Sequence, residues 1–149
     1  MPGDHTTELS FTGRAEPACL DHVHDLLARL WDEQPAVACG DRVLFTTAVV
    51  EVANNIVEHG GRAEPVELSL RLRLDAERIE AHFRDDGEAV DLDIGRARLP
   101  KDLAESGRGL SLVRAAVHEF GYQRTAGVNR WDLVRRRDGV HDGCGHVCG

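Results

Sequence analysis

The sequence contains little that would direct the protein to a membrane or to nucleic acid. No apolar run approaches the ~20 residues that cross a bilayer, because polar residues such as Glu51 and Asn54 interrupt the longest candidates. The N-terminus lacks the positively charged start and apolar stretch of a secretory signal. Lys101 is the only lysine, and the formal net charge is -8. This charge argues against a nucleic-acid-binding protein, which needs a surplus of Lys and Arg on one face to neutralise phosphates. We therefore expect a cytoplasmic protein that contacts neither membrane nor nucleic acid directly.

Cysteine is also scarce, and its spacing predicts no disulfide framework. The four cysteines are Cys19, Cys39, Cys144 and Cys148. In a cytosolic chain we expect them to be reduced thiols. The Gly-rich end also contains His141 and His146, but these groups are spaced more tightly than the ligands of common structural zinc sites. For residues 137–149 we favour a disordered tail over a zinc site.

The remaining composition is that of one ordinary folded domain. The chain has 149 residues, of which 42% are hydrophobic and 30% are charged. These values suit a single core and neither a disordered chain nor two domains. We find no internal repeat and no interdomain linker.

The hydrophobic pattern of the first half predicts two strands and two helices. Polar and apolar residues alternate over 8–13 and again over 66–74, which is typical of strands with one buried face. Apolar residues at helical spacing predict a helix over 17–33, with Pro17 in its first turn. A second helix is predicted over 42–59, with Asp41 as its N-cap.

The second half predicts a strand, an irregular lid, a short helix and a hairpin around Ala126-Gly127. These segments span 78–84, 85–108, 109–118, and 120–125 with 129–135. Irregular segments as long as the lid are usually functional or disordered. This order predicts an α/β two-layer sandwich, with a mixed, mostly antiparallel sheet and helices on one face. We expect ligand chemistry between the helices and the lid.

The predicted second helix carries a line of polar residues beside its apolar stripe. The stripe is formed by Phe45, Val49, Val52, Ala53 and Ile56. The polar line is formed by Thr47, Glu51, Asn55 and Glu58. Such a line is often only the solvated side of a helix. However, asparagine has a low helix propensity, and a solvated side of a helix rarely contains two of them in its middle, as at Asn54-Asn55. This favours a functional role for the polar line.

Two further polar clusters follow in the chain. Asp85-Asp86-Gly87 comes directly after a predicted strand, where a carboxylate can accept a hydrogen bond from a ligand amine while Gly87 permits close backbone approach. Gly107-Arg108-Gly109 opens the short helix, where free N–H groups and one guanidinium suit an anion. Either cluster alone is a weak signal, because acidic turns and glycine-ended loops are common.

The order and spacing of the three clusters are more specific than any one of them. Together they resemble the nucleotide-binding boxes of the GHKL ATPase superfamily. In chain order these boxes read Glu-x-x-x-Asn followed by His-Gly, then Asp-x-Gly, and then Gly-x-Gly-Leu. The short chain, its Leu-x-Phe entry strand and its Trp131-x-Leu closing strand are most similar to the bacterial anti-sigma-factor serine/threonine kinases. The resemblance covers residues 8–136 and implies the Bergerat ATP-binding fold of that superfamily.

The resemblance also implies ATP and Mg²⁺ as cofactors and assigns roles to individual residues. Asn55 corresponds to the Mg²⁺ ligand, since this ion prefers oxygen donors. Glu51 corresponds to the general base that acts on the attacking hydroxyl. Asp85 corresponds to the residue that binds the adenine amino group, and Gly87 to the glycine against which the base lies.

At the lid, Gly107, Arg108 and Gly109 correspond to the segment that wraps the phosphates. His59 also matches a motif position, although a purely structural role at the helix end explains it equally well. Ala89 stands where many relatives have a second glycine, and Glu58 adds an acidic group close to the expected phosphates.

Two functions stay open from the sequence. The first is an ATP-dependent serine/threonine kinase that phosphorylates a small antagonist protein and also sequesters a sigma factor. The alternative is an ATP-dependent switch module of the same fold that binds its partner without phosphorylating it. Retention of Glu51 favours the kinase, because a switch needs no base. A detached histidine-kinase domain is less favoured, and homodimer formation stays open.

Overall fold

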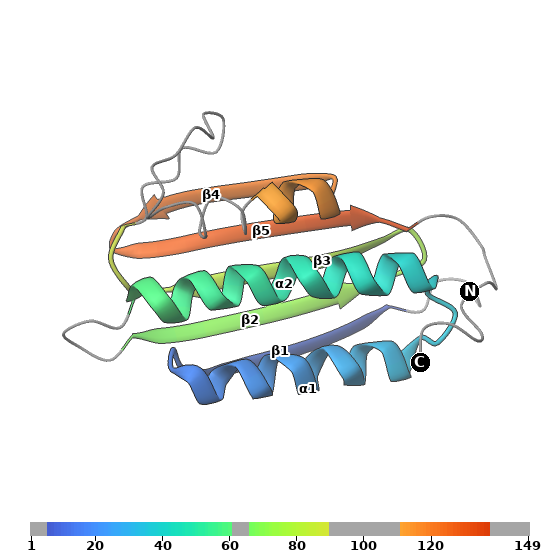
Figure 1. The fold of residues 1–149 in the computed structure, drawn as a ribbon, viewed down its shortest axis with the longest axis horizontal. Helices are drawn as coiled ribbons and strands as arrows, with labels where there is room; N and C mark the ends of the chain where they lie inside the picture. The colour runs from blue at the N-terminus through green and yellow to red at the C-terminus, as the bar shows by residue number, and fades with distance from the viewer. Residues whose placement is uncertain (1–5, 61–65, 90–110, 138–149) are drawn as a thin grey trace.

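The computed structural model describes residues 6–60, 66–89 and 111–137. In this part of the chain, two long helices lie against one face of a five-stranded sheet (Figure 1). The two-layer α/β sandwich predicted from the sequence is therefore confirmed. Most of the predicted lid, including Gly107, Arg108 and Gly109, lies outside the described residues. The tail from residue 138 onward, with the alternative zinc site, also lies outside them.

The sheet has the strand order β1-β2-β3-β5-β4. Its strands are β1 (Thr7–Arg14), β2 (Glu67–Leu74), β3 (Arg78–Asp85), β4 (Glu119–Thr125) and β5 (Val128–Arg136). Every neighbouring pair is antiparallel. The predicted hairpin between β4 and β5 turns at Ala126-Gly127, where φ is 54° and 81°. Positive φ at both central residues matches a two-residue turn whose twist suits the flanking strands.

The two long helices are α1 (Pro17–Glu33) and α2 (Cys39–Gly60). Pro17 occupies the first turn of α1, as predicted, since that position needs no N–H donor. Helix α2 begins earlier than predicted, so Asp41 is not its N-cap. Instead the Asp41 carboxylate is buried and accepts a hydrogen bond from Arg135 Nε of β5 at 2.9 Å. A short helical segment at 111–116 adds Val113 and Ala116 to the same core.

The core fills the space between the helices and the sheet. All five residues of the predicted α2 stripe are at most 3% exposed. From the sheet, alternate residues of β2 and β3 point inward and are buried, as the strict alternation requires. Trp131, Phe45 and Phe83 are the largest side chains of this core.

The cysteines differ from the expectation of four free thiols. Cys19 is a free thiol whose pKa is raised, chiefly because it is buried and also because the Glu16 carboxylate lies near it. Cys39 is disulfide-bonded, so the prediction was wrong for that residue. Within the described ranges, no helix is long and apolar enough to cross a bilayer.

The side of the sheet turned away from α1 and α2 is called the open face below. Its residues alternate with the core residues along each strand, and most are polar or charged. The helix side is called the covered face.

Candidate functional site

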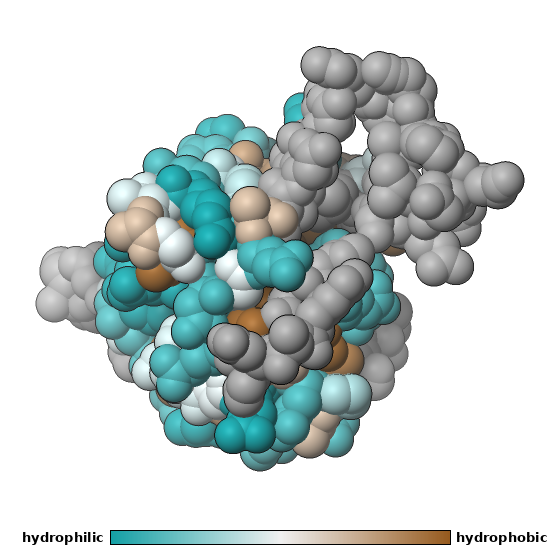
Figure 2. Space-filling model, turned by 90° about the vertical axis from the view of Figure 1, so that its left-hand side faces the viewer, coloured by the Kyte–Doolittle hydropathy of each residue, from teal (hydrophilic) through white to brown (hydrophobic). Residues whose placement is uncertain are grey.

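The two described elements that carry predicted site residues, α2 and β3, end on the same side of the sandwich. Helix α2 and strand β3 both end on the left side of Figure 1, where β5 begins. The view onto this end shows some hydrophobic side chains near the centre of a mainly hydrophilic surface (Figure 2). An apolar area beside polar groups suits a ligand that has both a flat apolar part and a polar edge.

Asp85 is the last residue of β3 and takes an inward position in the core register. Only 4% of it is exposed, and it continues the inward row of Ile79, Ala81 and Phe83. Its Oδ1 atom accepts hydrogen bonds from Gly87 N and Asn129 Nδ2, both at 2.9 Å. Its Oδ2 atom accepts one from Trp131 Nε1, also at 2.9 Å. The carboxylate is thus fixed in orientation by three donors from the protein.

These bonds leave Asp85 a limited acceptor capacity. An ionised carboxylate has about four lone-pair positions, of which the protein fills two on Oδ1 and one on Oδ2. The remaining position belongs to Oδ2. Asp85 can therefore accept one further well-formed hydrogen bond, which matches a single ligand donor.

Asn129 organises the surroundings of Asp85. It lies directly opposite Asp85 in the β3–β5 pairing and is fully buried. Its Nδ2 also donates to the backbone oxygen of Glu88 at 3.0 Å. Its Oδ1 accepts from the Tyr122 hydroxyl and from Arg124 at 2.8 Å. Asn129 thus connects the carboxylate, the loop after β3 and strand β4.

Arg124 adds a second connection to the loop that follows β3. Its guanidinium donates to the backbone oxygen of Gly87 at 2.9 Å. Because Gly87 N is bound to Asp85 and Gly87 O to Arg124, the peptide groups on both sides of this residue are held. The loop is therefore ordered by the protein itself where the predicted site needs a fixed backbone.

Helix α2 contributes the second predicted pair. Asn55 is 6% exposed, and its Nδ2 donates to the backbone oxygen of Glu51 at 3.0 Å. This bond fixes the amide, so that Oδ1 is the atom left for another partner. Among the described residues, Asn55 Oδ1 accepts no hydrogen bond and Glu51 forms no ion pair. The amide oxygen of Asn55 and the carboxylate of Glu51 are therefore available, as far as that part of the chain is concerned, to bind a metal ion or to accept a hydrogen bond.

The structure brings these residues together only in part. Asp85 and Gly87 are hydrogen-bonded, as are Asn55 and Glu51; the second pair belongs to the C-terminal half of α2, which ends on the side of the sandwich where β3 also ends. The side chain of His59 is not described, and the three lid residues lie outside the described ranges. Over the described part of the chain, no cluster of three His, Cys, Asp or Glu side chains could hold a metal ion by itself.

Asn129, Tyr122 and Arg124 were not predicted as site residues. One signal was present in the sequence: Asn129 shares the inward register of Trp131 and Leu133, where a polar residue is unexpected. The contacts of Tyr122 and Arg124 depend on the pairing of β4 with β5, which places both opposite or beside the buried residues of β5.

Comparisons with known proteins show which family the chain resembles. A model of the histidine kinase-like ATPase domain family matches residues 14–134. The serine/threonine-protein kinase BtrW of Bordetella bronchiseptica is 34% identical over 98 residues, which cover 62% of this chain and 69% of the relative.

A solved structure shares the fold. It contains the RsbU and RsbW domains of Rv1364c from Mycobacterium tuberculosis and matches with a TM-score of 0.61 and 22% identity. The match covers 88% of this chain, whereas this chain spans only 32% of the solved one. The family model, the kinase relative and the common fold lead to one conclusion: the chain belongs to the histidine kinase-like ATPase domain family, which implies ATP as its ligand.

Proposed function

We propose that the protein is an ATP-dependent serine/threonine kinase of the anti-sigma-factor type. It would phosphorylate a small antagonist protein and, as a second role, regulate a sigma factor. The observation that carries this proposal is the oriented Asp85 carboxylate, with one acceptor position left, on the side of the sandwich where α2, the helix of Glu51 and Asn55, also ends. The similarity to a serine/threonine-protein kinase supports the same function.

The residues around Asp85 fit the adenine end of ATP. The exocyclic amino group of adenine is a hydrogen-bond donor, and Oδ2 of Asp85 has room for one donor. Guanine presents a carbonyl oxygen at the corresponding ring position, and two facing acceptors repel each other. Asp85 would therefore bind the base and select adenine over guanine, while the restrained backbone at Gly87 supports its flat face.

The residues on α2 fit the phosphate end of ATP. Asn55 Oδ1 is an amide oxygen of the kind that Mg²⁺ accepts as a ligand, and its orientation is set by the bond to the Glu51 carbonyl. When bound, Mg²⁺ would neutralise negative charge on the phosphates of ATP. Gly107, Arg108 and Gly109 complete this part of the proposed site by contacting the phosphates.

Glu51 is the proposed general base. Its carboxylate has no cation as a partner among the described residues, so it is available to take the proton of a serine or threonine hydroxyl. Since it lies one helical turn before Asn55, the base and the metal ligand share one side of α2.

The test separates nucleotide binding from phosphoryl transfer. In Glu51→Gln the amide keeps the shape of the side chain but cannot accept the proton, and removal of a general base typically lowers the rate by ~10²- to 10⁴-fold. We expect transfer from labelled ATP to a candidate antagonist to fall by that factor, whereas the affinity for ATP is kept. The candidate antagonist is best chosen from the genes next to the one that encodes this chain.

Glu33→Gln is the control, because Glu33 is an exposed glutamate in the last turn of α1, on the opposite side of Figure 1 from the end of α2. This variant should transfer phosphate at the rate of the parent. Equal rates in the parent and in Glu51→Gln would show that Glu51 is not the base. If the parent binds ATP and its partner but labels no protein, the alternative of a non-catalytic switch module replaces the kinase.

A further inference from the structure

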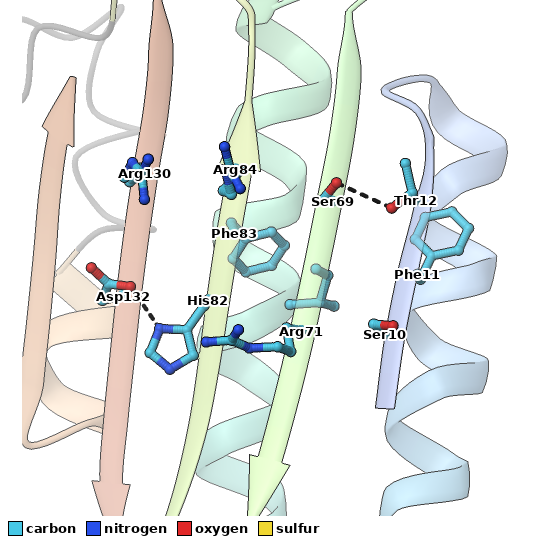
Figure 3. Close-up of a pocket in the computed structure, with 11 residues that line it drawn as sticks. Ser10, Phe11, Thr12, Ser69, Arg71, His82, Phe83, Arg84, Arg130 and Asp132 are labelled. Atoms are coloured by element: carbon cyan, nitrogen blue, oxygen red, sulfur yellow. Dashed lines mark hydrogen bonds and ion pairs between the residues drawn. The ribbon is translucent and has the colours of Figure 1, made fainter. Parts of the chain in front are cut away.

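The open face contains a hollow that the proposed kinase function does not use. Its volume is about 300 Å³, and it spans strands β1, β2, β3 and β5. Figure 3 looks onto this face, with the helices behind the sheet. The polar groups that line it include three hydroxyls and three guanidinium groups, from Ser10, Thr12, Ser69, Arg71, Arg84 and Arg130.

The three arginines are neighbours in the sheet. Arg84 of β3 lies directly opposite Arg130 of β5, and Ser69 on the other side of Arg84 is two residues from Arg71. Directly opposite side chains have their Cβ atoms only about 5 Å apart, and like charges at this distance destabilise a sheet. The placement of Arg84 and Arg130 therefore does not serve the stability of the fold.

These three arginines also have no acidic partner in the described part of the chain. No ion pair or side-chain hydrogen bond connects Arg71, Arg84 or Arg130 to another described residue. The carboxylate in the hollow, that of Asp132, is hydrogen-bonded to His82 at 2.6 Å. Three arginines and one carboxylate, with His counted as neutral, leave the hollow with a formal surplus of two positive charges, although the whole chain carries a net charge of -8.

The other end of the open face behaves differently. Arg73 is within 4 Å of Glu8, Asp75 and Glu80, and Arg78 pairs with Glu80 at 3.1 Å. Arg73 and Arg78 are therefore ion-paired, whereas the three arginines of the hollow are not; Arg136, which lies opposite Arg78, also has no ion pair with a described residue. This contrast indicates that the unpaired group is kept for an external anion.

The chemistry of the hollow favours a protein segment over a nucleic acid. Binding of single-stranded nucleic acid relies on aromatic side chains that stack on bases. The two phenylalanines that border the hollow belong to the covered side, since Phe83 is buried and Phe11 stacks on His22 of α1. A long polyanion would extend over the rest of the chain and be repelled by its net negative charge. A short acidic segment would stay at the hollow, and salt screens its repulsion from charges more than about 8 Å away.

We propose that the open face is a docking surface for an acidic segment of a partner protein. Carboxylates of that segment would pair with Arg84 and Arg130, whose guanidinium groups can each form two parallel hydrogen bonds to a carboxylate. The hydroxyls of Ser10, Thr12 and Ser69 add neutral donors and acceptors beside them. This surface faces away from Glu51, Asn55 and Asp85, so it extends the proposed function and does not depend on phosphoryl transfer.

The experiment uses the full chain and a defined probe. The probe is a fluorescein-labelled dodecapeptide in which Glu alternates with Thr, and the reference has Gln in place of each Glu. We expect the acidic peptide to bind more tightly than the reference, with an affinity that falls as salt is added. In Arg84→Ser/Arg130→Ser, loss of two charge-assisted contacts should weaken binding by about tenfold or more.

Arg78→Ser/Arg136→Ser is the matched control. These two arginines also lie opposite each other on β3 and β5 and on the same face, but at the other end of the strands. This variant removes the same charge and should change the affinity for the peptide by less than about threefold, as expected for distant, screened charges. Unchanged ATP binding in both variants would show that the fold and the proposed nucleotide site are intact, whether or not the kinase proposal holds.

Several outcomes would overturn the proposal. Equal weakening in the two double variants would mean that only net charge matters. Equal binding of the Glu and Gln peptides would show that carboxylates are not recognised. Tighter binding of a single-stranded oligonucleotide of equal charge would assign the hollow to nucleic acid. Self-association of the parent that is lost in Arg84→Ser/Arg130→Ser would assign it to a second copy of this chain.

Discussion

The covered and open faces of the sheet treat their polar groups in opposite ways. At the covered face, Asp85 and Asn129 are buried, and the protein satisfies almost every position that could bond. At the open face, their chain neighbours Arg84 and Arg130 are exposed and have no acidic partner among the described residues. Two residues of one strand thus differ completely in their surroundings, because successive side chains point to opposite sides of a sheet.

This difference separates two ways of preparing a binding site. A buried carboxylate needs donors to keep it in place without a ligand, since an unpaired buried charge is strongly destabilising. Exposed guanidinium groups are solvated and can remain unpaired until a partner arrives. The covered face therefore offers one oriented acceptor, and the open face offers several adaptable donors.

The largest expected effect concerns the stability of the two faces. Asn129→Leu removes a donor from Asp85 and an acceptor from Tyr122 and Arg124, and we expect it to lower the free energy of unfolding by about 3 kcal/mol. Arg130→Leu, one residue further and on the open face, should stay within about 0.5 kcal/mol of the parent. Urea unfolding followed by far-UV circular dichroism measures both. Similar losses in the two variants would break the comparison.

The next effect concerns ligand selectivity. Asp85→Asn replaces a carboxylate by an amide with only one acceptor atom, which the protein donors already require. We expect ATP to bind more weakly by about 2 kcal/mol, roughly thirtyfold in Kd, with a smaller preference over GTP. Arg84→Gln, on the open face, should leave both affinities unchanged. Titrations with ATP and GTP decide this, and parent-like affinities in Asp85→Asn would remove Asp85 from the proposed site.

The smallest effect concerns Asp75, which follows β2. Unlike the unpaired arginines of the open face, its carboxylate accepts hydrogen bonds from three donors of the protein. Burial works to raise the pKa of Asp75, but backbone N–H donors of Glu77 and Arg78 and the Arg73 guanidinium outweigh it, and the pKa is lowered. A lowered folded-state pKa means that Asp75 stabilises the fold above its unfolded pKa of about 4 and loses this contribution as the pH falls through the folded value.

Asp75→Asn should therefore lower the free energy of unfolding by about 1 kcal/mol at pH 7 and by less near pH 2. Asp25→Asn, an exposed change on α1, is the control and should follow the parent at every pH. Unfolding curves measured between pH 7 and pH 2 test the prediction. A constant difference between Asp75→Asn and the parent across this range would contradict it.

The sequence predicted most of the elements because local patterns determine them. Strict alternation located β2 and β3, and the Ala126-Gly127 turn located the hairpin of β4 and β5. The start of α2 was misplaced because Asp41 suits a local N-cap, whereas its partner Arg135 lies 94 positions away. Long-range partners of this kind leave no local pattern.

The candidate site divides in the same way. Asp85 and Gly87 form a contiguous motif and could be recognised, as could Glu51 and Asn55 one helical turn apart. The environment of Asp85 could not be predicted, because it depends on the register of β3 against β5, which sets Asn129 opposite the carboxylate. The unpaired arginines of the open face depend on the same register, since Arg84 and Arg130 are far apart in the sequence.

The strand order also has a consequence for how the chain folds. Strands β2 and β3 form one local hairpin and β4 and β5 another, whereas the seam between β3 and β5 joins residues that are at least 44 positions apart, the separation of Asp85 and Asn129. Local hairpins close early, and pairings across long loops close later, because loop closure has an entropic cost. A slip of one residue at this seam would exchange the two faces and place Arg84 toward the core. The Asp85–Asn129 pair therefore acts as a register lock between two independently forming hairpins, and Trp131, which donates to Asp85 across the same seam, is a natural fluorescent reporter of that final step.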